Sequence, residues 1–375
     1  MAPEIRHPRV EEFEDLMRYL ERAFGHSKGF FERVYPQLYQ PTEEAMSWAY
    51  VIGEEGKILS HVGLYPIETV TAGVRLSVGG IGAVSTAPEA RGQGHMTRLL
   101  YHIIDEMRRI GYPVSWLGGD RQRYNVFGWE LASPEYELTF TQRSLGWQDV
   151  EPVEIEEVFP EEALPAIRRF QSAPVCHPIR PNLADLIQKA NLRFWVAADG
   201  YAILSGQGRD HIRILELVST SGDEVGMIRA MLDFNFGERA TWSLSMWDRP
   251  RLGRLMPYAS YWRSGHSSMY RVNDLTKLMT EAQDAIAERA AAARDFAVAI
   301  GVKEHDRTTV TTLSVTDGVL GVRAGKHADT YVELSPVETA RLFLGGPPIA
   351  GEAVLPAPLI ALLPVPVYVF PWDHV

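Results

Sequence analysis

The sequence predicts an α/β (α+β) fold made of several domains, and three observations lead to this prediction. The chain has 375 residues, which at about 150 residues per domain suggests two to three domains. Hydrophobic residues make up 46% of it and charged residues 23%, as in ordinary globular proteins. Around residues 74–117, a strand pattern, a glycine-rich turn, an amphipathic helix and a second strand follow one another, which is the order of an α/β unit.

The elements before this unit follow from hydrophobic spacing. Residues 8–25 carry apolar side chains at helical intervals, which predicts a helix with one buried face. Residues 51–53 and 57–65 predict paired strands joined by the turn Glu54-Glu55-Gly56. Residues 74–86 predict a strand pair or one long strand that is rich in glycine, at Gly79, Gly80 and Gly82.

The clearest helix begins near Gly94. Apolar residues recur there at i, i+3, i+4 and i+7, and Gly111 follows as a suitable C-terminal cap. Residues 114–117 then predict a short apolar strand. The apolar positions of the helix are Met96, Leu99, Leu100, Ile103, Ile104, Met107 and Ile110.

The rest of the chain divides at two points. Glutamates accumulate around Pro152 and Pro160, which indicates a first boundary, and a third region opens after Val272. Strands or helices are expected over residues 194–204, 212–218, 226–236, 285–300 (a helix), 309–315, 319–322, 331–334 and 336–344. The domains expected are therefore residues 1–145, 146–272 and 273–375.

Charge and cysteine content exclude several classes of protein. The formal net charge is −11, which argues against nucleic-acid binding and is compatible with a cationic substrate. The single cysteine, Cys176, excludes an internal disulfide and a thiolate cage, and no metal is expected. The start of the chain lacks the apolar core of a signal peptide, and the apolar run 358–370 is too short to span a membrane. We therefore expect a cytoplasmic protein with no membrane span.

Residues 84–96 predict a binding site for a pyrophosphate. Gly92 and Gly94 remove side chains where a ligand must approach the backbone, and the helix that follows presents unpaired N–H groups. The spacing lacks the third glycine of a dinucleotide-binding turn and the Lys-Ser/Thr of a P-loop.

These residues resemble the acyl-CoA signature of GNAT N-acetyltransferases, Arg/Gln-x-x-Gly-x-Gly/Ala. Arg91 and Gly94 match it, and Met96 stands where the small residue is expected. Residues 123–129 resemble the Tyr-x-x-Phe-Gly-Phe/Tyr ending of the same fold. Over nearly its whole length the chain is similar to the Eis (enhanced intracellular survival) acetyltransferases, which accept a large apolar residue at the position of Met96. The resemblance implies tandem GNAT-like domains, the second degenerate, followed by a sterol-carrier-protein-like domain.

The resemblance also implies the chemistry. Acetyl-CoA would be the co-substrate, and its acetyl group would pass by direct attack in a ternary complex to a primary amine of a cationic small molecule or a peptide. Tyr124 would be the general acid, and the α-carboxylate of Val375 the base. The residues expected at the cofactor are Val84, Ser85, Thr86, Arg91, Gly92, Gln93, Gly94, His95, Met96, Gly119 and Asp120. A hexamer is implied by the family.

Other interpretations of these residues stay open. Tyr124 could instead be a buried core residue without a catalytic role. Residues 358–372 could instead form an edge strand that leaves Val375 free. Rival activities are an aminoacyl or long-acyl transferase of the tandem GNAT type and a carrier of apolar ligands in the C-terminal domain. We interpret Cys176 and His177 as a structural pair and residues 248–251 as a charged turn. The aromatic residues expected to be core or interface residues, or alternatively to line a substrate cleft, are Trp242, Trp247, Tyr258, Tyr261 and Trp262.

Overall fold

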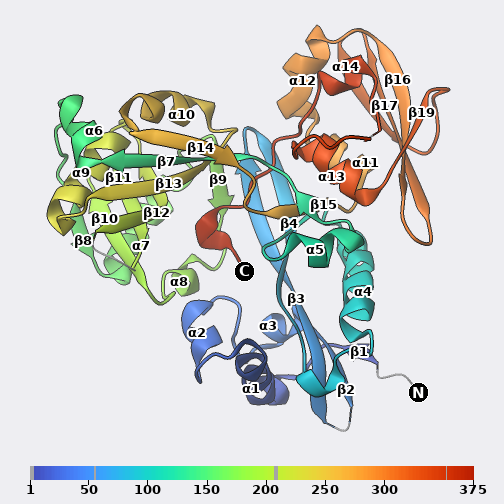
Figure 1. Cartoon of the computed structure of the whole chain (residues 1–375), viewed down its shortest axis with the longest axis horizontal. Helices are drawn as coiled ribbons and strands as arrows, with labels where there is room; N and C mark the ends of the chain where they lie inside the picture. Colours follow the sequence, from blue (N-terminus) through green and yellow to red (C-terminus); the bar gives the residue numbers. More distant parts are fainter. Residues whose placement is uncertain (1–3, 55, 207–209, 352) are drawn as a thin grey trace.

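The computed structural model describes residues 4–54, 56–206, 210–351 and 353–375, and it contains three β-sheets (Figure 1). The first sheet has the order β1-β2-β3-β4-β5-β15-β6, with β9 pairing β3. Its strands are β1 (Ile5–Arg6), β2 (Ala49–Glu54), β3 (Lys57–Thr71), β4 (Val74–Thr86), β5 (Val114–Leu117), β6 (Glu130–Leu131), β9 (Cys176–Ile179) and β15 (Met269–Val272).

Helices cover this sheet on both faces. On one face, α4 (His95–Ile110) packs its apolar stripe against the strands, as its spacing predicts, and Gly111 ends it in the left-handed conformation. The other face carries α1 (Phe13–Phe24), α2 (Phe30–Val34) and α3 (Glu43–Ser47) over part of its area. The β2–β3 strand pair and the long strand β4 are confirmed. The turn predicted between β2 and β3 includes Glu55, which lies outside the described residues.

The second sheet forms a separate lobe with the order β14-β7-β13-β12-β11-β10-β8. Its strands are β7 (Glu135–Thr141), β8 (Glu156–Val158), β10 (Leu192–Ala197), β11 (Gly200–Ser205), β12 (His211–Ser219), β13 (Arg239–Ser245) and β14 (Tyr261–Gly265). Its helices are α6 (Gln142–Trp147), α7 (Pro160–Phe170), α8 (Leu183–Leu186), α9 (Glu224–Asn235) and α10 (Arg249–Leu255).

Three strands connect the first two sheets across the predicted boundaries. β7 lies before residue 145 in the chain but pairs with β13 and β14 of the second sheet. β9 and β15 come from the middle of the chain but pair with β3 and with β5 of the first sheet. Each sheet is therefore completed by strands from beyond the predicted boundary.

The third sheet has the order β18-β17-β16-β19 and is packed with helices from the end of the chain. Its strands are β16 (Phe296–Lys303), β17 (Thr308–Thr316), β18 (Val319–Ala324) and β19 (Tyr331–Leu334). Its helices are α11 (Leu275–Glu281), α12 (Gln283–Ala292), α13 (Pro336–Leu344) and α14 (Ala357–Ile360).

One secondary-structure prediction in this region is wrong in part. The helix expected over residues 285–300 ends at Ala292, and Phe296–Lys303 forms β16. β16 pairs with β17 on one side and with β19 on the other. Alanine favours a helix, but pairing on both sides and burial of this apolar segment outweigh that propensity.

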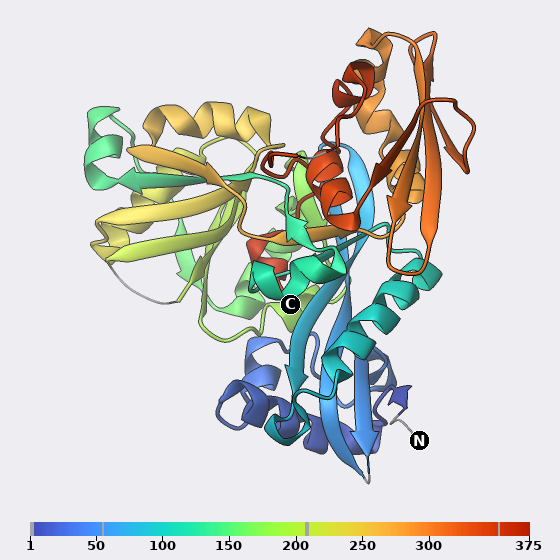
Figure 2. The same ribbon diagram turned by 45° about the vertical axis from the view of Figure 1, so that its right-hand side comes forward.

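The last residues return from the third unit to the first sheet. Residues 355–369 supply buried side chains to one hydrophobic core that also contains Val78, Trp116 and Tyr270 of the first sheet. Figures 1 and 2 show the C-terminus in the middle of the molecule, between the second lobe and strands β3 and β4. The apolar end of the chain therefore belongs to the hydrophobic core. Residues 361–370 do not form the edge strand that was the alternative interpretation.

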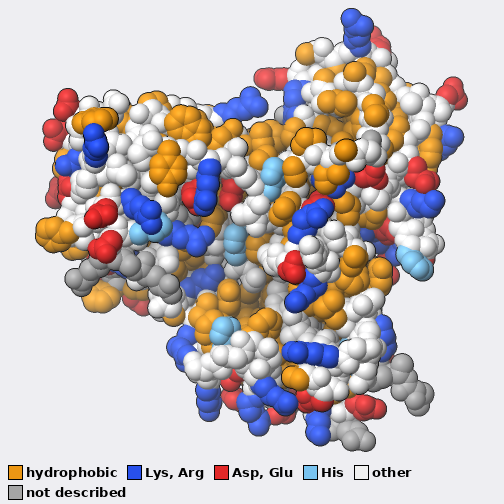
Figure 3. Space-filling view, viewed as in Figure 1, with side chains coloured by type: hydrophobic (Ala, Val, Ile, Leu, Met, Phe, Trp, Pro, Cys, Tyr) orange, Lys and Arg blue, Asp and Glu red, His pale blue; other side chains and the backbone are white. Residues whose placement is uncertain are grey.

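Two features concern the predicted lack of nucleic-acid and membrane partners: the charge distribution on the surface and the length of the helices. On the face seen in Figure 3, Lys and Arg side chains are interspersed with Asp and Glu side chains instead of forming one basic field. Among the described residues, no helix has both the length and the apolar character needed to cross a membrane.

Candidate active site

The candidate site lies where β4 and β5 separate. These parallel strands pair from Val78 with Val114 to Ile81 with Leu117, where β5 ends. β4 continues to Thr86, so its backbone edge beyond Ile81 has no partner from β5. A strand-like ligand can pair with such an edge, and Val84, Ser85 and Thr86 lie on it.

A bulge at Ala83 gives this edge its shape. The register between β3 and β4 shifts between His61 and Gly63, and Ala83 has a positive φ of 50°. His61 Nδ1 lies 2.9 Å from the Ala83 carbonyl oxygen, and Ser60 Oγ donates to the Ser85 carbonyl at 2.8 Å. Two buried polar side chains of β3 therefore hold the bulged segment of β4 in place.

The turn after β4 has open space around its glycines. Gly92 and Gly94 have φ values of +77° and +75°, and a Cβ at either would meet nothing within 4 Å. His95, the first residue of α4, is 5% exposed, and neither ring nitrogen has a hydrogen-bond partner among the described residues. A buried polar group with no partner is costly, so an acceptor or donor supplied by a ligand would satisfy it. Arg91 and Gln93 are exposed, and Met96 packs against the core beneath α4.

Tyr124 lies on the α4 face of the sheet, at the end of β5. It ends the short helix α5 (Arg121–Tyr124) and is 6% exposed, in a cluster with Leu117 and Phe127. Burial raises the pKa of its phenol above the ordinary value, and the neighbouring Arg123 offsets part of this rise. The phenol is therefore protonated at neutral pH.

The two residues before α5 have distinct roles. A Cβ at Gly119 would lie 3.1 Å from Tyr124 Cε2, so this glycine makes room for the ring. Asp120 is the N-cap of α5 and accepts a hydrogen bond from Gln122 N at 3.0 Å. Arg121 forms a bidentate ion pair with the buried Glu130.

Val375 lies on the opposite face of the same strands. A Cβ at Gly82 would lie 3.0 Å from the carboxyl carbon of Val375, and one at Gly80 would lie 2.9 Å from Val375 Cγ2. The ring of Tyr65 lies over Gly63, and Tyr65 Oη donates to Tyr39 Oη at 2.8 Å. Three glycines of β3 and β4 thus allow the chain end and the Tyr65 ring to pack closely against the sheet.

The residues just before Val375 are anchored on both sides. The ring of His374 stacks on Trp116 of β5, with centroids 4.4 Å apart, and burial lowers the pKa of His374 to about 4. Arg180, which follows β9, donates to both carboxylate oxygens of Asp373 at 2.7 Å and to those of Glu216 at 3.0 and 2.5 Å. Trp372 is 1% exposed in the core of the second lobe.

A pocket opens beside this chain end. Residues that follow α2 and α3, residues of β3 and of the second lobe, and residues of the tail converge on it. They include Trp48, Ile67, Glu68, Arg180, Asp373 and Val375. The lining residues Glu68, Asp373 and Val375 are acidic groups and Arg180 is basic, and an excess of negative charge favours a cationic ligand.

Comparisons with known proteins agree with this geometry. Residues 4–132 match the family model for an acetyltransferase (GNAT) domain. The chain carries a GNAT acetyltransferase domain. The predicted enzyme class, an acyltransferase, is confirmed, and so is the mixed α/β fold. Among curated proteins, none matches this sequence.

Several solved structures share the fold over nearly the whole chain. A probable N-acyltransferase from Enterococcus faecalis is 17% identical, with a TM-score of 0.73 over 96% of this chain and 95% of that one. A GCN5-related N-acetyltransferase from Kribbella flavida is 18% identical, with a TM-score of 0.71 and coverages of 97% and 96%. Eis1 from Mycobacterium abscessus is 15% identical, with a TM-score of 0.65 and coverages of 92% and 90%. At these identities the likeness shows a common fold.

The second sheet repeats the strand arrangement of the first sheet, with β12 and β13 in the places of β4 and β5, but it lacks the glycine turn. β12 and β13 are parallel, and their pairing ends at Ile214 and Trp242, although both strands continue. The following helix α9 begins with Glu224, which is fully buried and accepts a hydrogen bond from Arg254 Nη2 at 2.7 Å. A carboxylate therefore occupies the helix start where the first sheet has its glycine turn, and it would repel a phosphate.

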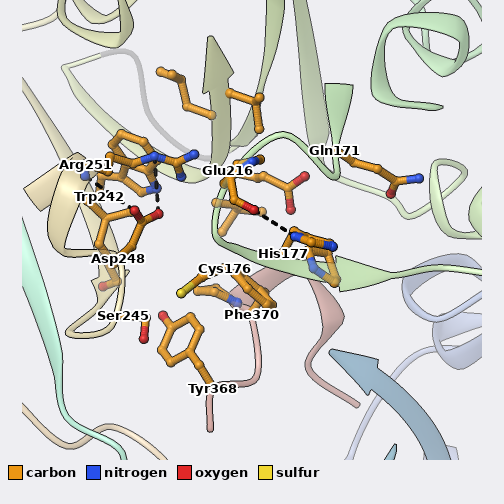
Figure 4. A pocket seen from close by; sticks show the side chains of 18 residues that line it. Gln171, Cys176, His177, Glu216, Trp242, Ser245, Asp248, Arg251, Tyr368 and Phe370 are labelled. Carbon is orange, nitrogen blue, oxygen red and sulfur yellow. Dashed lines mark hydrogen bonds and ion pairs between the residues drawn. The ribbon is translucent and has the colours of Figure 1, made fainter. Parts of the chain in front are cut away.

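The separation of β12 and β13 leads to a small pocket whose lining corrects one interpretation (Figure 4). Residues 248–251 are not simply a charged turn, because they begin the helix α10, and Asp248 is 4% and Arg251 7% exposed. Asp248 caps α10, and burial raises the pKa of its carboxyl group. Arg251 Nε lies 3.4 Å from Asp248 Oδ2 and pairs with this buried acid.

Cys176 and His177 lie on the other side of this pocket (Figure 4). Cys176 is buried, and burial raises the pKa of its thiol to about 12. His177 Nδ1 lies 2.7 Å from the Pro174 carbonyl oxygen, a local contact within one turn of chain. The described residues contain no group of three or more His, Cys, Asp or Glu that could hold a metal ion.

The aromatic residues of the second lobe differ in burial. Trp242 is 2% exposed and belongs to the core, as expected. Tyr261 and Trp262 are 55% and 51% exposed, so their prediction as core residues is wrong. They lie on β14, an edge strand whose side chains meet solvent.

The sequence patterns missed the residues that hold the chain end. Arg180, Asp373 and Trp116 come from three distant segments, and their meeting depends on the tertiary fold. One signal was present in the sequence, since Gly80 and Gly82 alternate along a strand and so share one face. Glycine inside a strand marks a close approach of other atoms, here the atoms of Val375.

The packing of Val375 on Gly82 predicts a kinetic effect of Gly82→Ala. The added Cβ must displace the Val375 carboxyl group by a few tenths of an ångström, because Tyr65 Cε2 blocks it at 3.1 Å on another side. With the Val375 carboxylate as the base that is proposed below, we expect kcat to fall about tenfold, since a small misplacement of a reacting group has an effect of this order. Steady-state kinetics measure the change. The matched control is Gly253→Ala, whose Cβ would meet nothing within 4 Å. Equal kcat values in the two variants would contradict the prediction.

Proposed function

We propose that this protein is an acetyl-CoA-dependent N-acetyltransferase. It transfers the acetyl group to a primary amine of a cationic small molecule or of a lysine side chain, by direct attack in a ternary complex, in the cytoplasm. The observation that carries the proposal is the meeting of three features where β4 and β5 separate. They are the glycine turn before α4, the phenol of Tyr124 on one face of the sheet and the carboxylate of Val375 on the other.

The turn has the properties that a CoA pyrophosphate requires. Backbone N–H groups from Arg91 to Met96 lie at the start of α4, where the helix dipole favours negative charge. The ring nitrogens of His95, which have no hydrogen-bond partner in the part of the chain that the structure describes, and the space around Gly92 and Gly94 fit a bound group of this kind. The pantetheine amides would pair with β4 at Val84, Ser85 and Thr86, and the thioester would lie near Gly119 and Asp120.

The acceptor must lose a proton to react. A lysine-like amine has a pKa near 10.4, so its deprotonation at pH 7 costs about 4–5 kcal/mol. In the proposed reaction the carboxylate of Val375 accepts this proton, directly or through water. The amine nitrogen forms a bond to the thioester carbonyl carbon, the carbon–sulfur bond breaks, and Tyr124 gives its phenolic proton to the leaving thiolate. The nitrogen then loses its second proton, which returns through water to the Tyr124 phenolate, and the Val375 carboxyl group releases the first proton to solvent. The products are an acetamide and CoA.

The pocket beside Val375 supports a cationic acceptor. Glu68, Asp373 and the terminal residue bring three negative charges to this pocket, against two positive charges: Arg180, which lines it, and Lys189, which bonds the Trp372 and His374 carbonyls. The apolar residues at the end of the C-terminal unit, proposed to be sterol-carrier-protein-like, pack into the core shared with the first sheet. This packing favours a structural role for that unit over the alternative of a carrier for apolar ligands.

Calorimetric titration with acetyl-CoA tests the proposal. We expect saturable binding, and we expect Gln93→Glu to weaken it about fivefold, because a negative charge in the turn repels the pyrophosphate. Gln148→Glu is the matched control, since it makes the same charge change at an exposed position of the second lobe. A screen of polyamines, aminoglycosides and lysine peptides with detection of released CoA then identifies the acceptor. Absence of acetyl-CoA binding would overturn the proposal.

A further inference from the structure

The chain end is held by a lysine of the second lobe that no sequence pattern indicated. Lys189 follows α8, and its Nζ donates to the Trp372 carbonyl at 2.9 Å and to the His374 carbonyl at 3.5 Å. It also lies 5.1 Å from the centroid of the Tyr35 ring. One ammonium group thus connects the tail to the N-terminal helices.

The loop that carries Lys189 is itself fixed. Ala190 N donates to the Arg33 carbonyl at 2.8 Å, at the end of α2. Burial lowers the pKa of Lys189 to about 8, and the charge of Asp373 partly offsets this effect. The ammonium group is therefore placed by its surroundings and is mostly charged at neutral pH.

The two contacts of Lys189 lie close to the last residue of the chain. The His374 carbonyl belongs to the last peptide bond, the one that joins Val375. Chain termini fray unless they are tied down. An ammonium group that holds the carbonyls of residues 372 and 374 restricts the direction in which the final residue leaves, and hence the position of its carboxylate over Gly82.

We propose that Lys189 is a positioning residue for the carboxylate of Val375. The inference rests on the proposed function, in which that carboxylate is the base. Lys189 acts through the tail and not on the reacting atoms, because its contacts are with backbone carbonyls of residues 372 and 374.

Lys189 is a better test of this role than Arg180. Arg180 pairs with the carboxylates of Glu216 and Asp373, and Tyr201 Oη also bonds Glu216. Its removal would leave buried carboxylates unpaired and would destabilise the second lobe. Lys189 bonds neutral carbonyls, so its replacement leaves no partner carboxylate without a cation.

The kinetic test compares Lys189→Met with Lys189→Arg. We expect Lys189→Met to lower kcat about tenfold with the Kd for acetyl-CoA within about twofold of the wild-type value, because a misplaced base affects the chemical step alone. Lys189→Arg, which keeps the charge and donors, should recover most of the activity. The matched control is Lys326→Met, since Lys326 lies 5.2 Å from the Tyr331 ring centroid in the third unit. An unchanged kcat in Lys189→Met, or a parallel loss in the control, would overturn the proposal.

A second measurement follows the tail without using activity. Carboxypeptidase releases Val375 at a rate that depends on how often the chain end is free. We expect at least about fivefold faster release from Lys189→Met than from the wild type or Lys326→Met, as local opening becomes easier. Equal release rates would overturn the positioning role. Faster release with unchanged kcat would show that the tail is held by Lys189 but does not supply the base, and the proposed mechanism would then be wrong.

Discussion

Extending the chain beyond Val375 with a hexahistidine tag is expected to lower kcat by about 100-fold or more. The added peptide bond converts the terminal carboxylate, which lies against Gly82, into an amide that cannot accept a proton. Positioned acid–base groups contribute about 10²–10⁴-fold to rates, so the loss of the base should be of this size. The Kd for acetyl-CoA should stay nearly unchanged, because the glycine turn before α4 lies outside the tail.

The control for this prediction is the same tag at the N-terminus, which should leave kcat at the wild-type value. Removal of the C-terminal tag by a protease that leaves no extra residue should restore the activity. Calorimetry with acetyl-CoA on both tagged proteins separates loss of binding from loss of chemistry. A fully active C-terminally tagged enzyme would eliminate Val375 as the base while leaving the acetyl-CoA site untouched.

Replacing Tyr124 with phenylalanine is expected to lower kcat by about 100-fold, the size typical of a lost general acid. The ring is 6% exposed and packs beside Phe127 and Gly119, so phenylalanine keeps the packing and removes the hydroxyl group alone. Burial raises the pKa of the phenol, which keeps it protonated and able to donate at neutral pH. Stopped-flow or steady-state detection of released CoA measures the effect.

Tyr101→Phe is the matched control for Tyr124→Phe. Tyr101 lies on α4, is 44% exposed and packs its ring against the same Phe127, with centroids 5.3 Å apart. We expect it to change kcat less than about twofold, as surface substitutions usually do. Equal thermal stability of the two variants would exclude unfolding as the cause. If Tyr124→Phe keeps near wild-type kcat, the leaving thiolate receives its proton from another source.

Elements with local signals were predictable from the sequence. The stripe of apolar residues from Leu99 to Met107 predicts α4, because helical periodicity can be recognised within a short window. The same holds for the β2–β3 strand pair and for the capping box of α13, where Ser335 Oγ accepts from Glu338 N. Residues 296–300 were predicted wrongly as helix, because their state as part of β16 depends on β17 and β19, which lie elsewhere in the chain.

By itself, then, the sequence determined the turn from Arg91 to Met96, the helix behind it and the tyrosine that follows β5, since all three lie within one continuous segment. The tertiary structure alone decided that Val375 meets Gly82, that Arg180 and Lys189 hold the tail, and that β15 completes the first sheet. These contacts join residues that are far apart along the chain. Burial and strand pairing in the folded molecule select the two residues of each such contact. A local sequence pattern therefore cannot predict which residues will meet.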